Sequence, residues 1–220
     1  MPSPQLAQLA RANIYDMVSD DKGGVWICSS AGLGHYSNGS GTLHLYTTRN
    51  SQLPDNEVFC IGLANDGQGW ISTASGQCMW NSYYHMITTS GMMQRLVKMG
   101  MLRSIKRLAN GRMIFIPQNG FPGTIDPAEG ILRGLSFNDL DSYSTLLDIL
   151  PFGDKCYIIT CSDAIYFVDK QGTARRFGHI DGLANSQFQS HAIQIDESSG
   201  TYWAATNDGL VYAKLSDIRQ

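Results

Sequence analysis

A short motif that returns at a nearly fixed interval constrains this chain more than any other feature. In each full copy, a glycine stands three residues before a tryptophan and another stands six residues after it. The full copies are centred on Trp26, Trp70 and Trp203, and their following glycines are Gly32, Gly76 and Gly209. Weaker copies place Ile114 and Tyr157 at the tryptophan position, so successive anchors are 44, 44, 43 and 46 residues apart. A period in the forties with several strand-like runs per repeat is typical of the blades of a β-propeller.

Each repeat reads as a series of antiparallel strands joined by turns. Polar turn sequences such as 65–67 (Asn-Asp-Gly) separate the first strand-like run from the second. Residues 43–46 and 174–177 alternate between polar and apolar side chains, as the outermost strands of a sheet do. The fifth repeat ends after its third strand-like run, 209–215. The sequence therefore predicts an all-β fold, a β-propeller of about five four-stranded blades with the last blade incomplete.

The period also sets the expected domain boundaries. We expect residues 1–8 to form a lead-in and residues 9–220 a single propeller domain. The blades are expected at 9–48, 53–90, 100–137, 144–178 and 183–216. The Met-rich stretch 91–100 fits either a helical turn or an outer strand. The missing last strand predicts either further blades or a partner chain at the open blade edge.

Composition excludes several classes of function. A net charge of −3 over 220 residues gives no reason to expect a nucleic acid or an anionic membrane as partner. No run of about 18 apolar residues is present, and the first residues lack the basic start and apolar stretch of a signal peptide. An odd number of cysteines without a C-x-x-C pair favours small buried side chains over disulfides or a metal site. These are Cys28, Cys60, Cys78, Cys156 and Cys161. No metal and no cofactor is expected.

The repeat resembles a known family at the level of its motif. The pattern Asp-x-x-Gly-x-x-Trp-x-x-Thr-x-x-Gly-Leu, preceded by Gly-Leu-Pro-x-Asn and an apolar strand, is similar to the two-component regulator propeller repeat. The resemblance spans residues 9–215 and is closer in blades one, two and five than in three and four. It implies a propeller from the periplasmic sensor region of a hybrid two-component histidine kinase. Such regions bind ligands, oligosaccharides in several cases, at the propeller faces and signal through a dimer. The resemblance supplies no catalytic motif, and it implies that the repeated Trp, Tyr157 and Gly residues pack the blades.

Catalytic alternatives depend on a few acidic and histidine side chains. Asp16, Glu57 and Asp148 lie near the predicted innermost strands, and a glycosidase would need such carboxylates to converge in one central pocket. A lyase of the streptogramin-inactivating type would need a histidine base beside a metal-binding glutamate. The histidines show no paired spacing of that kind; they are His35, His44, His85, His179 and His191. The aspartates near residue 20 resemble half of a calcium loop but lack its downstream glutamate. We assign no catalytic residue.

Candidate ligand-binding residues are those that could provide aromatic platforms and planar polar groups. They are Trp80, Tyr83, Tyr84, His85, Arg103 and Phe121. Residues of these types are more often core or ordinary surface than binding residues, and exposed clustering of several of them would favour a binding site. The resemblance to two-component regulator propellers thus implies a non-enzymatic, periplasmic ligand-sensing module that binds an oligosaccharide, another small molecule or a partner protein. A five-bladed carbohydrate-active hydrolase and a structural propeller fragment that mediates oligomerisation remain alternatives.

Overall fold

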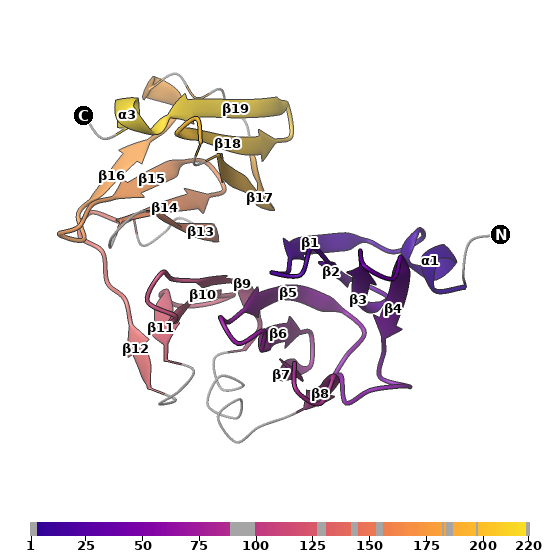
Figure 1. Ribbon diagram of the computed structural model, residues 1–220. Helices are drawn as coiled ribbons and strands as arrows, with labels where there is room; N and C mark the ends of the chain where they lie inside the picture. The colour runs from indigo at the N-terminus through magenta and orange to yellow at the C-terminus, as the bar shows by residue number, and fades with distance from the viewer. Residues whose placement is uncertain are drawn as a thin grey trace. The chain divides into compact units, whose positions relative to one another are not determined.

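The computed structural model describes residues 4–88, 100–126, 131–141, 145–152, 156–181, 183, 187–196 and 198–218. Within these residues the chain forms five antiparallel sheets, four with four strands and the last with three (Figure 1). The prediction of an all-β protein built from propeller blades, the last of them incomplete, is confirmed. The chain divides into two compact units, Met1–Arg133 and Gly134–Gln220, which are described separately below.

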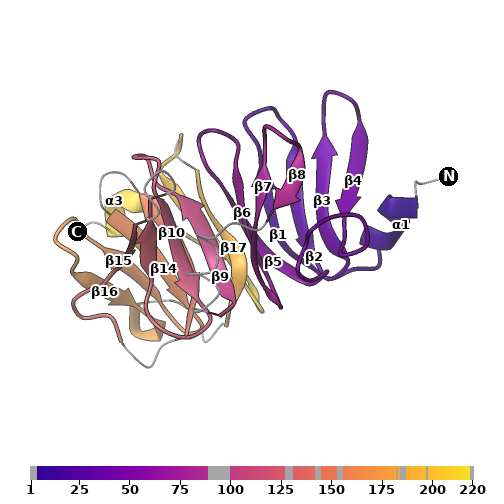
Figure 2. The ribbon, with the colours of Figure 1, turned by 90° about the horizontal axis from the view of Figure 1, so that it is seen from below.

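Unit 1 contains the first three sheets. A short helix, α1 (Pro4–Leu9), forms within the predicted lead-in and lies beside the last strand of the first sheet (Figure 2). The first sheet consists of β1 (Ile14–Ser19), β2 (Val25–Ser29), β3 (Gly32–Ser37) and β4 (Thr42–Tyr46). The second consists of β5 (Val58–Leu63), β6 (Gly69–Thr73), β7 (Gly76–Asn81) and β8 (Met86–Thr88). The third consists of β9 (Leu102–Arg107), β10 (Met113–Pro117), β11 (Gly123–Ile125) and β12 (Leu132–Gly134).

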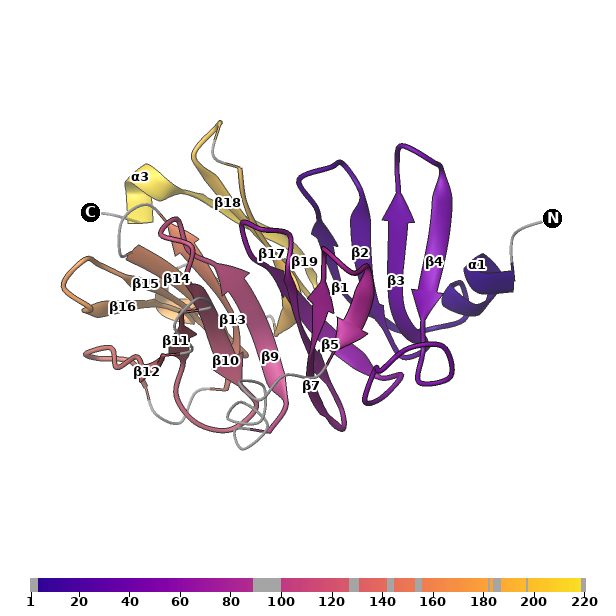
Figure 3. The ribbon, with the colours of Figure 1, turned by 60° about the horizontal axis from the view of Figure 1, so that its bottom comes forward.

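Unit 2 contains the last two sheets. The fourth sheet consists of β13 (Leu146–Phe152), β14 (Cys156–Cys161), β15 (Ile165–Val168) and β16 (Ala174–Phe177). A 3-10 turn, η1 (His179–Asp181), follows it. The fifth sheet consists of β17 (Phe188–Asp196), β18 (Thr201–Thr206) and β19 (Gly209–Lys214), followed by the helix α3 (Leu215–Ile218) (Figure 3).

The predicted outermost strands at 43–46 and 174–177 are present as β4 and β16. Most of the Met-rich stretch, 91–99, lies outside the described residues. The helices that the structure describes are all too short or too polar to cross a membrane.

The repeated motif encodes a hairpin between the second and third strands of a blade. At the end of the second strand, a serine or threonine hydroxyl donates a hydrogen bond to the carbonyl oxygen of the motif glycine three residues later. The pairs are Ser29–Gly32 at 2.8 Å, Thr73–Gly76 at 2.6 Å and Thr206–Gly209 at 3.0 Å. These glycines have φ values of 132°, 134° and 143°, a region that side chains rarely allow. A Cβ atom at Gly32 would also clash with the carbonyl oxygen of Tyr46. The backbone of these three hairpins therefore favours glycine at this position.

A second repeated feature is a β-bulge near the start of each innermost strand. In the first four sheets, the pairing between the first and second strands passes over one residue of the first strand. The residues passed over are Tyr15, Phe59, Arg103 and Leu147. In the fifth sheet the irregular stretch is longer and lies between Phe188 and Ile193. A bulge bends the strand and redirects a side chain, so every blade is distorted at the same end of its first strand.

The strand register corrects the alignment of the fourth repeat. Trp26 lies three residues before Ser29, which ends β2 and pairs with Gly32 of β3. In the fourth sheet, Cys161 takes the place of Ser29, and its backbone N–H donates to the carbonyl oxygen of Ala164 at 2.8 Å. Three residues before Cys161 is Ile158, not Tyr157. The sequence alignment slipped by one residue because this hairpin has alanine where the other copies have glycine.

The residues at the tryptophan position of the repeat differ in how far they are buried. Trp26 and Trp70 are 2% exposed and Ile158 is fully buried, so these three lie in the cores of their units. Tyr157 is partly exposed. Trp203 is 40% exposed and has the ring of Tyr212 5.2 Å away. The expected packing position is thus retained in the first two blades but is open to solvent in the last one.

Candidate functional site

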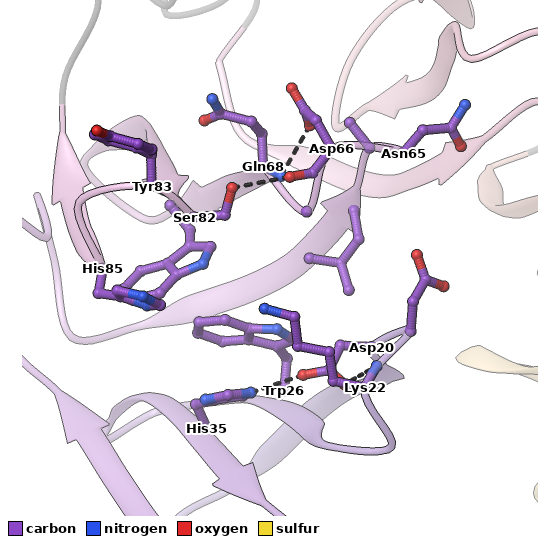
Figure 4. Close-up of a pocket in the computed structure, with 15 residues that line it drawn as sticks. Asp20, Lys22, Trp26, His35, Asn65, Asp66, Gln68, Ser82, Tyr83 and His85 are labelled. Atoms are coloured by element: carbon purple, nitrogen blue, oxygen red, sulfur yellow. Dashed lines mark hydrogen bonds and ion pairs between the residues drawn. The ribbon is translucent and has the colours of Figure 1, made fainter.

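Three hairpin turns gather at one end of the first two sheets in unit 1. The turn between β1 and β2 forms one wall, and the β5–β6 and β7–β8 turns form the other (Figure 4). They enclose a pocket of about 630 Å³. The turns occupy the same end because β5 and β7 run in the same direction within an antiparallel sheet.

Aromatic and imidazole rings form the interior of this pocket. The rings of Trp26 and His35 stack with centroids 4.2 Å apart and an angle of 23°. Trp80 lies 5.0 Å from Trp26 at 60°, and the His85 ring lies 6.0 Å from Trp80. Trp80 is 6% exposed. The two indoles therefore present only a small part of their surface to the pocket, and the histidines extend the ring surface outward.

Asp20 organises the first wall. Its Oδ1 accepts hydrogen bonds from the backbone N–H groups of Gly24 at 2.7 Å and Lys22 at 2.9 Å. Its Oδ2 lies 2.9 Å from Nε2 of His35. Desolvation raises the pKa of Asp20, but the bonds from His35, Gly24 and Lys22 together outweigh it and hold this pKa below its usual value. The pocket therefore contains a carboxylate that stays ionised at neutral pH and fixes the orientation of a histidine ring.

The second wall is held by bonds between and within its two turns. The Ser82 hydroxyl donates to the backbone carbonyl oxygen of Asp66 at 2.9 Å and so joins the two turns. Within the β5–β6 turn, the backbone N–H of Gln68 donates to Oδ1 of Asp66 at 3.0 Å. The side-chain oxygen of Gln68 is buried and has no hydrogen-bond partner among the described residues. Gln68 therefore lines the pocket with other parts of its surface and not with this oxygen.

The β7–β8 turn presents two more side chains to the pocket. Oδ1 of Asn81 accepts the N–H groups of Tyr83 and Tyr84, both at 3.0 Å. His85 has φ of 51°, a conformation uncommon for a residue with a side chain. This tight turn leaves Tyr83 81% exposed at the edge of the pocket.

The structure separates the predicted ligand-binding residues into two groups. Trp80, Tyr83 and His85 line the pocket. Tyr84 lies on the same turn, 66% exposed, with its ring 4.9 Å from that of Tyr83. Arg103 is the bulge residue of β9, and Phe121 follows β10, so both lie at the opposite end of the strands.

Sequence reasoning missed much of the polar lining of the pocket. The missed residues are Asp20, Lys22, His35, Asp66 and Gln68. Asp66 and Gln68 belong to a turn that was interpreted only as a hairpin connection, and Asp20 and Lys22 belong to the acidic turn that was compared with half of a calcium loop. Their recurrence at the same place in blades one and two was the available signal, because equivalent turns of adjacent blades lie at the same end of their sheets.

The three carboxylates considered for hydrolysis have structural partners. Asp16, in unit 1, is 6% exposed and accepts the N–H of Met17 at 2.9 Å. Glu57 accepts the hydroxyl of Tyr15 at 2.8 Å, a bond that raises the pKa of Tyr15. Asp148, in unit 2, is buried and accepts the N–H of Ile149 at 2.8 Å. The described residues contain no group of three or more side chains suited to hold a metal ion.

Comparisons with known proteins identify the fold. No family model and no curated protein matches the chain. The extracellular domain of the hybrid two-component system BT3049 from B. thetaiotaomicron matches with a TM-score of 0.76 and 16% identity, over 94% of this chain and 28% of that one. The extracellular domain of the hybrid two-component system BT4673 from the same organism matches with a TM-score of 0.58 and 18% identity, over 92% of this chain and 32% of that one. Virginiamycin B lyase from Staphylococcus aureus matches with a TM-score of 0.57 and 17% identity, over 91% of this chain and 69% of that one.

These matches agree with the resemblance predicted from the repeat motif. The chain spans only about a third or less of the two-component domains it resembles. Virginiamycin B lyase, which matches the same fold, is an enzyme. At these identities the comparison establishes architecture and not activity. The chain shares the β-propeller fold of the extracellular domains of hybrid two-component systems.

Proposed function

We propose that this chain is an extracellular, periplasmic ligand-sensing module that binds a small polar molecule in the unit 1 pocket without converting it. The observation that carries the proposal is the composition of the pocket. Rings of His35, His85 and Tyr83, backed by the mostly buried Trp26 and Trp80, lie beside the charged or amide side chains of several turns. Pockets that combine apolar ring surface with a few placed polar groups are the usual form of a small-molecule site.

An oligosaccharide fits this chemistry. The apolar face of a sugar ring packs on aromatic rings, and its hydroxyl groups need acceptors and donors at fixed positions. Asp20 and Asp66 provide oxygen acceptors, and Lys22 provides a cationic donor. The exposed Tyr83 at the edge of the pocket can close over part of a bound ring. The similarity in fold to two-component extracellular domains is consistent with a role in sensing.

The state of the pocket carboxylate favours binding over hydrolysis. A glycosidase needs one carboxylic acid whose pKa is raised so that it can donate a proton. The pKa of Asp20 is instead lowered by the bonds it accepts. The other pocket acids, Asp21 and Asp66, lie on exposed turns, and Asp21 Oδ2 lies 3.7 Å from a guanidinium nitrogen of Arg107. This arrangement suits a hydrogen-bond acceptor better than a general acid.

A thermal-shift screen of neutral and acidic oligosaccharides, monosaccharides and amino acids tests the proposal. A ligand that binds only the folded state raises the unfolding free energy by RT ln(1 + [L]/Kd), about 2.7 kcal/mol at 100 times Kd. We expect one chemical class to raise the unfolding temperature. Tyr83→Ala and Lys22→Ala should reduce the shift, and Phe121→Ala should not, because Phe121 is equally a surface residue at the far end of the strands.

Chromatography of the ligand after prolonged incubation separates binding from catalysis. We expect the ligand to be recovered intact. A stoichiometric product, or a shift that Tyr83→Ala and Lys22→Ala leave unchanged, contradicts the proposal.

A further inference from the structure

The fifth sheet ends in an open edge strand. In the other four sheets, a fourth strand pairs with the third. β19 pairs with β18 along its whole length, from Gly209 to Lys214, and no other described strand pairs with it. The outer edge of such a strand presents backbone donors and acceptors that can template another strand.

The exposed side chains of this sheet gather on one face. Trp203 pairs across the strands with Tyr212, and Ala205 pairs with Leu210, so these four residues point to the same side. Leu210 is 70% exposed, Tyr212 65% and Trp203 40%. Contiguous exposed apolar side chains of this size mark interaction surfaces more often than they mark ordinary surface.

The first and fourth blades show which side chain a fourth strand places opposite the third strand. Leu33 follows the motif glycine of the first blade, as Leu210 does in the fifth, and it faces Tyr46 of β4. The corresponding residue of the fourth blade, Ile165, faces Phe177 of β16. A strand that completes the fifth blade should therefore place an aromatic side chain opposite Leu210.

We propose that this strand is β19 of a second copy of the chain, paired antiparallel about a twofold axis at Val211. In this register Val211 faces its own counterpart, and Leu210 faces the partner's Tyr212. The new pair repeats the Leu33–Tyr46 pair of the first blade. The two three-stranded sheets become one continuous six-stranded sheet, and the contact closes as a symmetric dimer.

Charge complementarity selects this register over its neighbours. Here Lys214 faces the partner's Asp208, while the apolar side chains face each other. A shift of two residues in one direction places Asp208 opposite the partner's Tyr212. A shift in the other direction places Lys214 opposite the partner's Leu210. Lys214 is already held on the exposed face, because its ammonium donates to Thr201 Oγ1 at 2.8 Å and to the Ser199 carbonyl oxygen at 3.0 Å.

Light scattering on the full chain tests whether the dimer forms. We expect the mass to rise towards twice 24.2 kDa with concentration. A double variant, Leu210→Lys with Tyr212→Lys, should weaken dimerisation at least tenfold, because it places four like charges at the edge. Both side chains are mostly exposed, so the variant should retain the circular dichroism of the parent. Phe121→Lys, which changes another exposed ring, should leave the mass unchanged.

Cysteine cross-linking tests the register. Val211→Cys places two thiols directly opposite each other, with Cα atoms about 4.5 to 5.5 Å apart, within disulfide range. Leu210→Cys places the two thiols on a diagonal about 7 to 8 Å apart, beyond that range. We expect Val211→Cys to cross-link at least ten times faster than Leu210→Cys, with the parent chain as background for its native thiols. A monomeric parent at all concentrations, an undiminished mass in the double variant, or equal cross-linking rates overturns the proposal.

Discussion

At the scale of single residues, Asp20 connects the turn geometry to the chemistry of the pocket. One oxygen of its carboxylate holds two backbone amides of the β1–β2 turn, and the other contacts the ring that stacks on Trp26. A single side chain thus shapes the turn and orients His35.

The charge of Asp20 should contribute to stability in a pH-dependent way. Asp20→Asn keeps the oxygen that binds the turn amides but loses the charged contact with His35. We expect a loss of about 1 kcal/mol of unfolding free energy at neutral pH. Because the folded-state pKa is lowered, this contribution is present above the unfolded-state pKa and fades as pH falls through the folded-state value. Urea unfolding at several pH values measures it, and a gap between parent and variant that widens towards low pH contradicts the assignment.

Gly24 is predicted to be required for this arrangement. A Cβ atom there would lie 2.6 Å from Asp20 Oδ2 and 2.8 Å from the Tyr36 carbonyl oxygen. Gly24→Ala should therefore cost about 1 to 3 kcal/mol by overpacking, and it should displace the carboxylate that positions His35. Gly39→Ala is the matched control, because a Cβ at Gly39 meets nothing within 4 Å. Equal unfolding midpoints for the two variants would contradict the prediction.

At the scale of elements, the strand register explains where sequence reasoning succeeded. The hairpin glycines could be found because only glycine adopts their backbone angles readily, and they marked three of the five blades correctly. In β14 this signal is absent, since Ala164 takes the glycine position, and the aromatic Tyr157 was preferred to its neighbour Ile158. An aromatic residue favours its own selection in an alignment that is based on tryptophan, but the strand register determines the position.

The corrected alignment predicts different costs for two adjacent substitutions. Ile158→Ala removes a fully buried side chain from the core of unit 2 and should cost about 2 to 5 kcal/mol. Tyr157→Ala removes a partly exposed ring that packs on Phe137 at 5.7 Å and should cost less than half as much. Chemical unfolding of both variants measures the difference. A larger loss for Tyr157→Ala would restore the original alignment.

The candidate site was only partly predictable for a related reason. The aromatic run in blade two is dense enough to be noticed, and three of its members line the pocket. Asp20 lies in the β1–β2 turn and His35 lies 15 residues later on β3, so they meet only because β2 and β3 return the chain to that turn. Arg103 and Phe121 were grouped with the aromatic run by residue type alone, and the direction of their strands places them at the other end.

At the scale of the whole molecule, the period of the sequence predicted the fold because each blade repeats the same pairing. All five cysteines lie in strands, four of them buried, and no disulfide joins them. The expectation that they are small buried side chains is therefore confirmed for four of the five. Folding must depend on the apolar cores of the two units rather than on covalent cross-links.

Thiol labelling should report the unfolding of both units. Burial raises the pKa of Cys78 to about 12 and also raises that of Cys28, so neither forms the reactive thiolate in the folded state. We expect Cys156, which is partly exposed, to react first with iodoacetamide, and the other four to react only as the chain unfolds. Mass spectrometry of timed samples identifies the order. Early modification of Cys28 or Cys78 in native buffer would contradict the described packing.

The central claim is that a ligand occupies the unit 1 pocket. Amide hydrogen exchange, with and without a saturating concentration of the ligand found by the thermal-shift screen, tests it without any substitution. We expect the three turns at 20–24, 65–68 and 82–85 to gain protection together, while residues 117–121 at the opposite end do not change. Protection confined to 117–121 or to unit 2, with the three turns unaffected, would contradict it.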